Sequence, residues 1–288
     1  ASHGQTLLHN PPAYTLQIGE GQCIAQHTQK PVIYDFRTAD LVVGGQGAPL
    51  IPIVDEFLLR EEKKDVFALN LGGIANITYL PSRESGKDLV AFDTGPANTL
   101  IDKAVYEFTK GKETYDPDGT YACRGSVNNE MLKEMLSHQY YSKKLPKSAG
   151  QEQFGYAYFD NLLQKYSPKN DKEWYSFIRT LSELTIQTIA NEIKEISSKN
   201  RKKSKVLVAG GGALNFYIMS GLQDKLNPMS VNKFMHEKID SDIKEAFGFA
   251  YLAYLHVKGI PGNVPSVSGA AYPVVLGKLT FPSCLKRS

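Results

Sequence analysis

The sequence contains little cysteine and almost no excess charge of either sign. Its 288 residues include 3 cysteines, Cys23, Cys123 and Cys284, whose number is odd and whose spacing is wide. This set indicates neither a disulfide framework nor a zinc site, and it predicts a reducing, cytoplasmic compartment. A formal net charge of +3 is too small to indicate a nucleic-acid partner. The one dense basic run, 199–205, is interpreted as a solvated loop, with a patch for nucleic acid or another anion as the alternative.

Long apolar runs and leader segments are lacking as well. No run of about 18 apolar residues occurs, so no membrane span is expected. The chain starts without a Met or a signal-like segment, and residues 1–6 resemble the end of a strand already in progress. We therefore expect that the N-terminal part of a longer protein precedes them. The histidines have no metal-ligand spacing and no Gly-x-Ser-x-Gly elbow occurs, so neither a metal site nor a hydrolase triad is predicted.

The sequence does contain an alternation of strand-like and helix-like segments. Hydrophobic residues make up 42% of the chain and charged residues 22%, as in ordinary globular proteins. The alternation predicts an α/β fold, with the glycine-rich segment 44–49 as a hinge or a domain boundary. The helix at 242–257 is apolar on most of its circumference and is expected to be buried. Strands are predicted at 15–18, 31–35, 205–209 and 274–276 and as a hairpin over 66–92 with its turn at 81–88; helices are predicted at 24–28, 50–60, 98–109, 128–138, 156–165, 174–198, from 216 onward, and at 242–257.

Two neighbouring strand ends give the first functional signal. One apolar run, 66–71, leads into Gly72 and Gly73, and a second run, 89–92, ends at Asp93. Glycines at a strand end bring backbone N–H groups close to a ligand, as in loops that hold oligophosphates. A carboxylate at a strand end is fixed before substrate arrives, which suits a general base. We interpret the pair as a nucleotide-phosphate loop beside a catalytic carboxylate; the alternative for Asp93 is a helix N-cap.

A second nucleotide signal follows the strand predicted at 205–209. Gly210, Gly211 and Gly212 stand between this strand and a helix. Three glycines allow a base and a ribose to lie against bare backbone, and the helix N-terminus favours negative charge. The spacing differs from the dinucleotide pattern G-x-G-x-x-G, which has an acidic residue about 20 positions further on. The alternative is a tight strand-to-helix turn that binds no ligand.

Several polar residues at the ends of predicted elements are candidates for contacts with a sugar. The segment His3-Gly4-Gln5-Thr6 and Arg37 lie at strand ends, where their polar side chains suit sugar hydroxyls or a carboxylate, although each is also a common surface residue. Glu245 begins the apolar helix, where it either contacts substrate or only stabilises the helix dipole. Lys147 and Ser148 lie in a Pro-Lys-Ser loop that either contacts phosphate or is solvated.

Together these segments resemble the anhydro-N-acetylmuramic acid kinase family, which also includes levoglucosan kinases and belongs to the actin/hexokinase/Hsp70 ATPase superfamily. The resemblance covers essentially the whole chain in one order. It implies a two-domain actin-like, ribonuclease H-like fold with the site in the cleft between the domains: 1–45 completed by 265–288, and 46–264 with the ATP and catalytic motifs. The segments that carry it are HGQT (3–6), DFR (35–37), GGQGAPL (44–50), NLGGIAN (70–76), FDTGPAN (92–98), PKSAG (146–150), AGGGALN (209–215), KEAFGFAYLA (244–253) and PGNVPSVSGA (261–270).

The activity that the resemblance implies is a kinase of peptidoglycan recycling. It uses ATP and Mg²⁺ to open the ring of 1,6-anhydro-N-acetylmuramic acid with water and to phosphorylate O6. Asp93 is then the general base that takes a proton from the attacking water, and no metal ligand is assigned. The implied partner is this small anhydro sugar, and a homodimer is compatible with the resemblance. The residues assigned to ATP are Gly72, Gly73, Asn76, Gly210, Gly211, Gly212 and Asn215, and those assigned to the sugar are Thr6, Arg37 and Glu245.

The chain departs from the family pattern in two places. The Ser-Gly-Thr-Ser-x-Asp-Gly phosphate loop at the start of family members has no counterpart in this sequence. This loop is one of the two phosphate clamps of the family, so the sequence contains only the other clamp. The family stretch Pro-Lys-Ser-Thr-Gly-Arg-Glu has Ala149 and Gln151 in place of Thr and Arg, which weakens the case for a phosphate role of this loop. Three alternatives therefore stay open: a non-catalytic sugar- or nucleotide-binding member, a levoglucosan kinase, and an ordinary sugar kinase in which Asp93 deprotonates a free hydroxyl.

Overall fold

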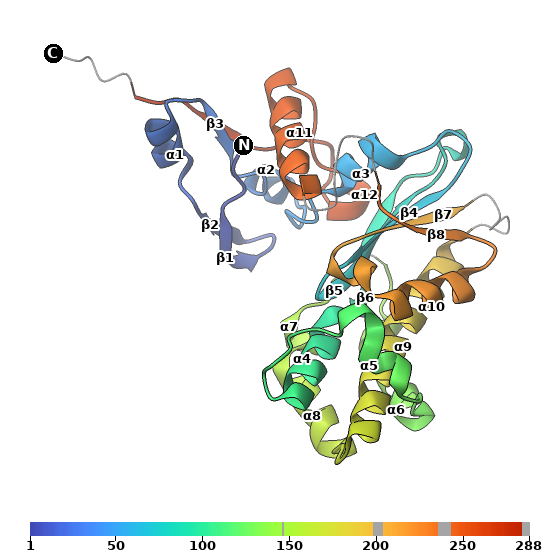
Figure 1. Ribbon diagram of the computed structural model, residues 1–288. Coiled ribbons are helices and arrows are strands. Elements are labelled where there is room, and N and C mark those ends of the chain that lie inside the picture. Colours follow the sequence, from blue (N-terminus) through green and yellow to red (C-terminus); the bar gives the residue numbers. More distant parts are fainter. Residues whose placement is uncertain (146, 198–203, 236–242, 284–288) are drawn as a thin grey trace. The chain divides into compact units, whose positions relative to one another are not determined.

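The computed structural model describes residues 1–145, 147–197, 204–235 and 243–283 (Figure 1). Cys284 and most of the basic run at 199–205 lie outside these residues. Contacts divide the chain into two compact units, one formed by 1–59 with 236–288 and the other by 60–235. None of the described helices is long and apolar enough to cross a membrane.

A mixed five-stranded sheet forms the centre of the second unit, which confirms the α/β prediction. Its strand order is β6-β5-β4-β7-β8, so β6 lies at one edge. β5 is antiparallel to both β4 and β6, whereas β7 is parallel to β4 and to β8. The strands are β4 (Val66–Leu71), β5 (Ile74–Leu80), β6 (Val90–Pro96), β7 (Lys205–Ala209) and β8 (Ser230–Lys233).

The hairpin predicted over 66–92 is wrong, because this segment forms three strands. The Gly72–Gly73 pair turns the chain between β4 and β5, and Leu71 pairs with Ala75 across the turn. The segment 81–88 then connects β5 to β6. Both 66–71 and 74–80 are strongly apolar, so the sequence pattern predicts one continuous strand across the glycines. In the structure the chain reverses at the glycines, and the two segments pair as antiparallel neighbours.

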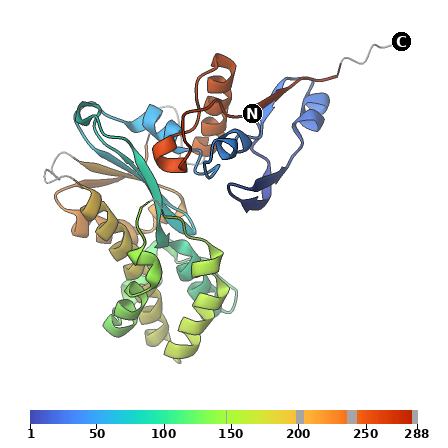
Figure 2. The same cartoon turned by 180° about the vertical axis from the view of Figure 1, so that it is seen from behind.

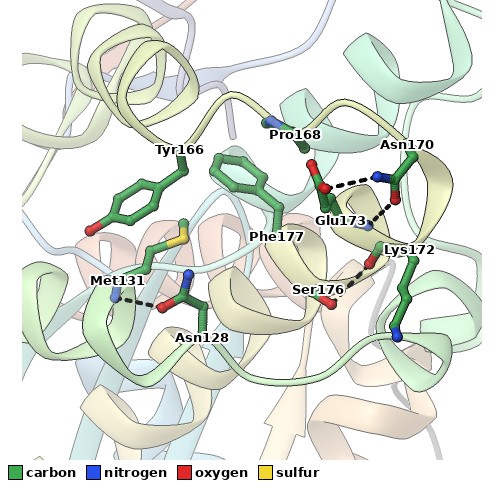
Figure 3. A pocket seen from close by; sticks show the side chains of 9 residues that line it. All are labelled: Asn128, Met131, Tyr166, Pro168, Asn170, Lys172, Glu173, Ser176 and Phe177. Atoms are coloured by element: carbon green, nitrogen blue, oxygen red, sulfur yellow. Dashed lines mark hydrogen bonds between the residues drawn. The ribbon is translucent and has the colours of Figure 1, made fainter.

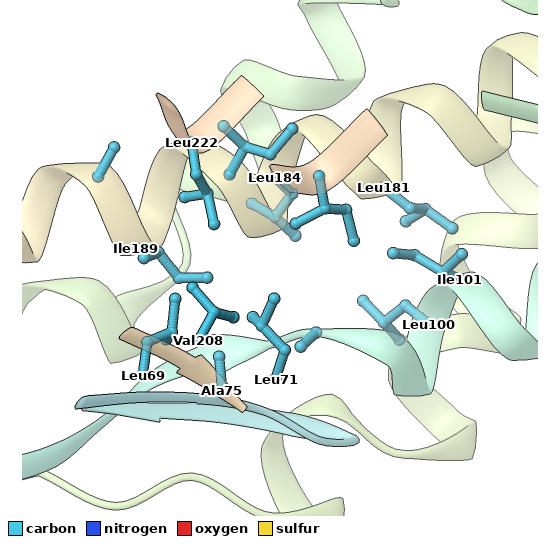
Figure 4. Packing of buried hydrophobic residues seen from close by; sticks show 14 of the residues in the cluster. Leu69, Leu71, Ala75, Leu100, Ile101, Leu181, Leu184, Ile189, Val208 and Leu222 are labelled. Atoms are coloured by element: carbon cyan, nitrogen blue, oxygen red, sulfur yellow. The ribbon is translucent and has the colours of Figure 1, made fainter. Parts of the chain in front are cut away.

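The helices of the second unit gather on one face of the sheet (Figures 1 and 2). α4 and α9 pack directly on this face: Leu100 and Ile101 of α4 lie with Leu184 and Ile189 of α9 in a single core (Figure 4). Each buried leucine or isoleucine stabilises the fold by roughly 1.5–3 kcal/mol. The helices are α4 (Asn98–Thr109), α5 (Thr120–Arg124), α6 (Asn129–Leu136), α7 (Gln151–Phe154), α8 (Tyr156–Tyr166), α9 (Asp171–Ile196) and α10 (Phe216–Leu226), with short 3₁₀ turns at Arg83–Ser85, Pro117–Gly119, Gln139–Ser142 and Gly211–Leu214.

The first unit contains two small antiparallel sheets and five helices within the described residues. β1 pairs with β2, and β3 pairs with β9. A small core collects apolar side chains of β3, α11 and the segment before β9, among them Ile33, Leu252 and Leu276. The elements are β1 (Gln5–Asn10), β2 (Tyr14–Ile18), α1 (Gly21–Thr28), β3 (Val32–Tyr34), α2 (Thr38–Val42), α3 (Pro52–Leu59), α11 (Lys244–Lys258), α12 (Pro265–Ser268) and β9 (Lys278–Thr280).

Two expectations for the C-terminal part of the chain are wrong. α11 is not buried all round, since Val257 is 68% exposed and only Gly248, Leu252 and Leu255 are buried; several of its aromatic rings stack on one another instead. The segment 274–276 is not a strand, because its backbone groups bond elsewhere. The Leu276 carbonyl accepts from the His256 ring, and the last strand, β9, begins two residues later.

The compact units defined by contacts end at residues 59 and 235, whereas the predicted domains end at residues 45 and 264. Residues 46–59 and the described part of 236–264 belong with the first unit, because α3 and α11 pack on each other. A buried ion pair at 2.5 Å between Lys244 and Asp55 joins these two helices. The assignment of 46–264 to one functional domain stays a prediction.

The carboxylate of Asp40 holds three segments of the first unit together. Oδ1 accepts from the Asn263 amide and the Ser268 hydroxyl, both at 2.7 Å, and Oδ2 accepts from the Gly47 backbone N–H at 2.7 Å. Asp40 is 1% exposed, so water has little access to these donors. The glycine-rich segment predicted as a hinge is therefore anchored by a buried acceptor.

Substitution Asp40→Ala should lower the free energy of unfolding by roughly 3 kcal/mol, since three buried donors lose a charged acceptor. Asp40→Asn should recover part of this loss, because it keeps one acceptor oxygen. Urea denaturation measures both, with Lys30→Ala on the surface of the same unit as the control. Equal stability of the Asp40→Ala and Lys30→Ala variants would contradict the role given to Asp40.

Candidate active site

The first turn of α4 fixes the orientation of the Gly72–Gly73 turn. The Asn98 backbone N–H donates to the Gly72 carbonyl at 3.0 Å, and those of Ala97 and Thr99 donate to the Gly73 carbonyl at 2.9 and 3.1 Å. The Asn98 side-chain amide donates to the Leu71 carbonyl at 3.1 Å. Three consecutive carbonyl groups of the turn therefore face α4.

This arrangement directs the backbone N–H groups of the two glycines away from α4. The peptide bonds here are trans, and in a trans peptide the C=O and the following N–H point in opposite directions. Because the Leu71 and Gly72 carbonyls face Asn98, the amides of Gly72 and Gly73 face the other way. No described residue accepts a hydrogen bond from either amide. Two such adjacent N–H groups suit an anion.

The second glycine loop packs against the first. β7 is parallel to β4, with Ala209 opposite Asn70, so both strands end at the same edge of the sheet, where ligands bind in α/β folds. Gly210 has φ 85° and ψ 169°, a region that is essentially restricted to glycine. A Cβ there would lie 2.7 Å from the Asn70 side-chain oxygen and from the Leu71 carbonyl oxygen. A Cβ on Gly212 would lie 2.7 Å from the Leu71 Cβ, whereas one on Gly211 would meet no atom closer than 4.0 Å.

Asp93 lies in a row of polar side chains that crosses three strands. Asn70 on β4 is opposite Asn76 on β5, and Asn76 is opposite Asp93 on β6. Directly opposed residues project to the same face, so the three side chains share the face opposite the one that packs on α4 and α9. A bulge between Ala75 and Asn76 shifts the register with β6. Bulges are common next to active sites, where they re-aim a side chain.

The carboxyl group of Asp93 is half-buried and is hydrogen-bonded through one oxygen. The Ala149 backbone N–H donates to Oδ2 at 2.8 Å. Burial raises the pKa of Asp93, the Ala149 N–H counteracts this by lowering the pKa, and the negative charge of Glu152 raises it further. A carboxylate with a raised pKa is a stronger base, and no described residue donates a hydrogen bond to Oδ1 of Asp93.

Asn215, which the sequence analysis assigned to the cofactor, is engaged in the fold. Its side-chain oxygen accepts from the Ile218 N–H at 3.1 Å and caps α10. The residue is buried beside Gly119. A contact between its side chain and a nucleotide stays a prediction.

The three residues assigned to the sugar belong to the first unit. Arg37 donates to the Gly47 carbonyl at 2.7 Å and lies 3.2 Å from Nε2 of His3. The His3 ring stacks on Phe249 at 4.3 Å, and Glu245 stands one helical turn before Phe249 on α11. Burial and the charge of Arg37 lower the pKa of His3, so its ring is neutral and accepts from Arg37.

Thr6 is not joined to this group by a hydrogen bond. It lies in β1 opposite Gln17, and its hydroxyl makes no hydrogen bond within the described part of the chain. Within the first unit, the structure thus brings Arg37 and the helix face of Glu245 together through His3 and Phe249. His3 belongs to the polar segment 3–6 that the sequence analysis selected, whereas Phe249 was not selected.

The expectation that Lys147 is solvated or contacts phosphate is wrong. Its side chain is 2% exposed and pairs with Glu192 of α9 at 2.6 Å. Ser148 is exposed. The loop that contains them lies along the edge strand β6 and contacts the backbone and side chain of Asp93.

Sequence reasoning also missed Asn70 and Asn98. Each flanks a glycine motif, and a polar amide beside such a motif was the available signal. The two side chains contact both loops, because Gly210 approaches Asn70 and Gly212 approaches Asn98. Their role becomes visible only when β4, β7 and α4 are placed together.

A separate cavity of about 420 Å³ lies between α6, the end of α8 and the start of α9 (Figure 3). Its polar groups serve the helix ends: Asn128 accepts from the Met131 N–H, and Asn170 and Glu173 cap each other at the start of α9. It contains none of the predicted site residues. Among the described residues, no group of three or more His, Cys, Asp or Glu side chains is placed to hold a metal ion.

Comparisons with known proteins agree with the sequence motifs. A model of the family "Anhydro-N-acetylmuramic acid kinase" matches residues 1–282. An anhydro-N-acetylmuramic acid kinase of Gloeobacter violaceus is 42% identical over 283 residues, which are 96% of this chain and 72% of that protein. One of Caldanaerobacter subterraneus subsp. tengcongensis is 39% identical over 290 residues, 97% of this chain and 73% of that protein.

A solved structure, the activator of the 2-hydroxyisocaproyl-CoA dehydratase from Clostridium difficile with bound ADPNP, matches with a TM-score of 0.39 and 12% identity over 73% of this chain and 66% of that chain. The sequence matches define the class of protein as a sugar-directed phosphotransferase with an α/β fold. The chain belongs to the anhydro-N-acetylmuramic acid kinase family.

Alanine substitutions at the adjacent residues Gly210 and Gly211 should have different effects on stability, because only the Cβ position of Gly210 is occupied by neighbouring atoms. Gly210→Ala should lower the free energy of unfolding by roughly 3 kcal/mol, because a Cβ strains the backbone and collides with the end of β4. Gly211→Ala should change it by less than about 1 kcal/mol, since its Cβ position is open. Thermal and urea unfolding of both variants measure the difference; equal losses would contradict the packing described for Gly210.

Proposed function

We propose that the protein uses ATP to phosphorylate O6 of 1,6-anhydro-N-acetylmuramic acid while water opens the anhydro ring. The observation that carries this proposal is the position of Asp93. Its half-buried carboxylate, to whose Oδ1 no residue of the described ranges donates, stands in register with Asn76 and Asn70, beside two glycine loops. Family membership supports the substrate class.

The glycine loops are suited to the phosphates and the nucleoside of ATP. The amides of Gly72 and Gly73 are turned outward and lack acceptors among the described residues, and a phosphate oxygen would complete their hydrogen bonding. Gly211 leaves its backbone open for a ribose or base. Mg²⁺ is usually held by one or two carboxylates, waters and substrate phosphates, so we propose that it binds together with ATP and neutralises charge on the phosphates.

Asp93 serves as the general base in this proposal. Its Oδ1 takes a proton from water as the water oxygen bonds to C1 of the sugar. The C1–O6 bond breaks, and the electron pair that stays on O6 forms the new bond to the γ-phosphorus, from which ADP leaves. The products are N-acetylmuramic acid 6-phosphate and ADP. The raised pKa of Asp93 supports this role, because a stronger base accepts the proton more readily.

The first unit supplies the proposed sugar contacts. Arg37 is held by the Gly47 carbonyl and by neutral His3, which fixes its guanidinium. Burial lowers the pKa of Arg37, but the group stays charged at neutral pH. A fixed cation suits the lactyl carboxylate of the substrate, and Thr6 and Glu245 suit its hydroxyl and amide groups. A cytoplasmic location is also part of the proposal, and it agrees with free thiols at Cys23 and Cys123.

Asp93→Asn should lower kcat by about 10²- to 10⁴-fold and leave ADP binding unchanged, because the amide cannot take the proton. The variant should also unfold at a higher temperature at neutral pH. Burial raises the folded pKa of Asp93 above its unfolded value, so its ionised form costs stability at pH values above that folded pKa. Coupled ADP release, calorimetry with ADP and thermal unfolding measure the three effects. Undiminished turnover would remove Asp93 from the mechanism.

Turnover in H₂¹⁸O should place one ¹⁸O atom at C1 of the product and none in the transferred phosphate. This follows because water, and not an existing hydroxyl, attacks the anomeric carbon. Mass spectrometry of the product before and after removal of the phosphate locates the label. Turnover of levoglucosan without turnover of the N-acetylated sugar would identify levoglucosan as the substrate. A product that carries no ¹⁸O would indicate an ordinary sugar kinase.

A further inference from the structure

A buried ion pair stands next to Asp93 without touching its carboxyl group. Lys147 Nζ lies 2.6 Å from Oε1 of Glu192, and the two side chains are 2% and 12% exposed. The Lys147 ammonium also lies 5.2 Å from the centre of the Tyr140 ring. Replacing such a pair with apolar residues is often neutral or stabilising, so stability alone does not explain why two charges are buried here.

The backbone of the same lysine is bonded to Asp93. The Asp93 N–H donates to the Lys147 carbonyl at 2.9 Å, and two residues further on the Ala149 N–H donates to Oδ2 of Asp93 at 2.8 Å. Residues 147–149 thus bind Asp93 at its backbone and at its carboxylate. The Lys147 side chain connects this short segment to α9, which is the longest helix described and packs in the core.

The backbone carbonyl of Asp93, on the same edge of β6, is fixed in a similar way. The Tyr140 hydroxyl donates to the Asp93 carbonyl at 2.7 Å, and burial raises the pKa of Tyr140, so the hydroxyl remains a donor. Since β6 is an edge strand, the outward N–H and C=O of Asp93 would otherwise lack partners. The ionisable groups around Asp93 are Tyr140, Lys147 and Glu152 from the adjoining segment and Glu192 from α9.

We propose that the Lys147–Glu192 pair is a positioning pair: it holds the Ala149 amide on Oδ2 of Asp93 and leaves Oδ1 free to accept the proton from water. The inference rests on the proposed role of Asp93 as the base. The pKa of Asp93 is shifted by burial, by the Ala149 N–H and by the charge of Glu152, and not directly by the pair. The effect of the pair is therefore transmitted through the position of residues 147–149.

The test removes both charges at once, in the variant Lys147→Met with Glu192→Leu. The protein should stay folded, since apolar side chains of similar size replace the pair. The pKa of the Asp93 carboxyl should rise, because the Ala149 hydrogen bond that lowers it is weakened. Carbon-13 NMR of aspartate-labelled protein, with the Asp93 signal assigned by its loss in Asp93→Asn, measures this pKa without any need for activity.

The kinetic consequences are a matching shift and a loss of rate. A base is active when deprotonated, so the acidic limb of the kcat/KM profile should move to higher pH. At the pH optimum kcat should fall on the order of 10- to 100-fold, with the KM for ATP unchanged, because a misplaced base slows the chemical step. The single variant Lys147→Arg, with Glu192 unchanged, should keep most of the rate, since it retains a cation opposite Glu192.

The matched control is Lys165→Met. Lys165 pairs with Glu134 on the surface of the same unit, where the side chains are 57% and 41% exposed, and its loss should alter neither the pKa of Asp93 nor kcat. Should the double variant fail to fold, Glu192→Gln keeps a hydrogen-bond acceptor for Lys147 and tests the charge alone by the same NMR titration.

The two possible failures can be told apart. An Asp93 carboxyl that titrates in the double variant as in the unsubstituted protein would overturn the positioning role. A shifted pKa in the double variant, together with full turnover in Asp93→Asn, would instead uphold the pair and overturn the role of Asp93 as base.

Discussion

The contact between the first turn of α4 and the Gly72–Gly73 turn is the constraint on which the rest of the site depends. Asn98 is its centre, because its backbone N–H and its side-chain amide bind the carbonyls of Gly72 and Leu71, while its side-chain oxygen limits the approach of Gly212. The free amides at the N-terminus of a helix usually make it an anion site. Here the N-terminal amides of α4 donate to the carbonyls of the glycine turn. The amides of Gly72 and Gly73 then take the role of the anion site.

Local patterns predicted the elements with strong periodicity and clear ends. α4 was predicted at 98–109 and is found there, since Leu100, Ile101, Ala104 and Val105 form one buried face. The strand before Gly210 was also predicted at its observed limits. Pairing was harder to infer: the glycine pair at 72 and 73 lies between two apolar runs, and only the partners of those runs show that the chain reverses there.

The same limit explains which site residues the sequence did and did not disclose. Strand-end glycines and Asp93 stand out locally, because few residue types suit those positions. Lys147 looks like a loop residue in its own segment, and its partner Glu192 stands 45 positions further on in α9. α11 was expected to be buried from its composition, but its aromatic rings stack along the surface. Contacts made by distant parts of the chain decided these outcomes.

The edge position of β6 connects the stability of the second unit to its proposed chemistry. An edge strand exposes backbone groups that need partners, and at Asp93 these partners are the Lys147 carbonyl and the Tyr140 hydroxyl. The segment that satisfies the strand also covers the carboxylate, which raises its pKa, and donates one hydrogen bond that limits the rise. Burial strengthens the base but costs stability when it is ionised. A strand in the middle of the sheet has both of its edges paired to neighbouring strands, so it could not offer this second set of partners. The edge therefore gives the base a position that a covering segment can adjust.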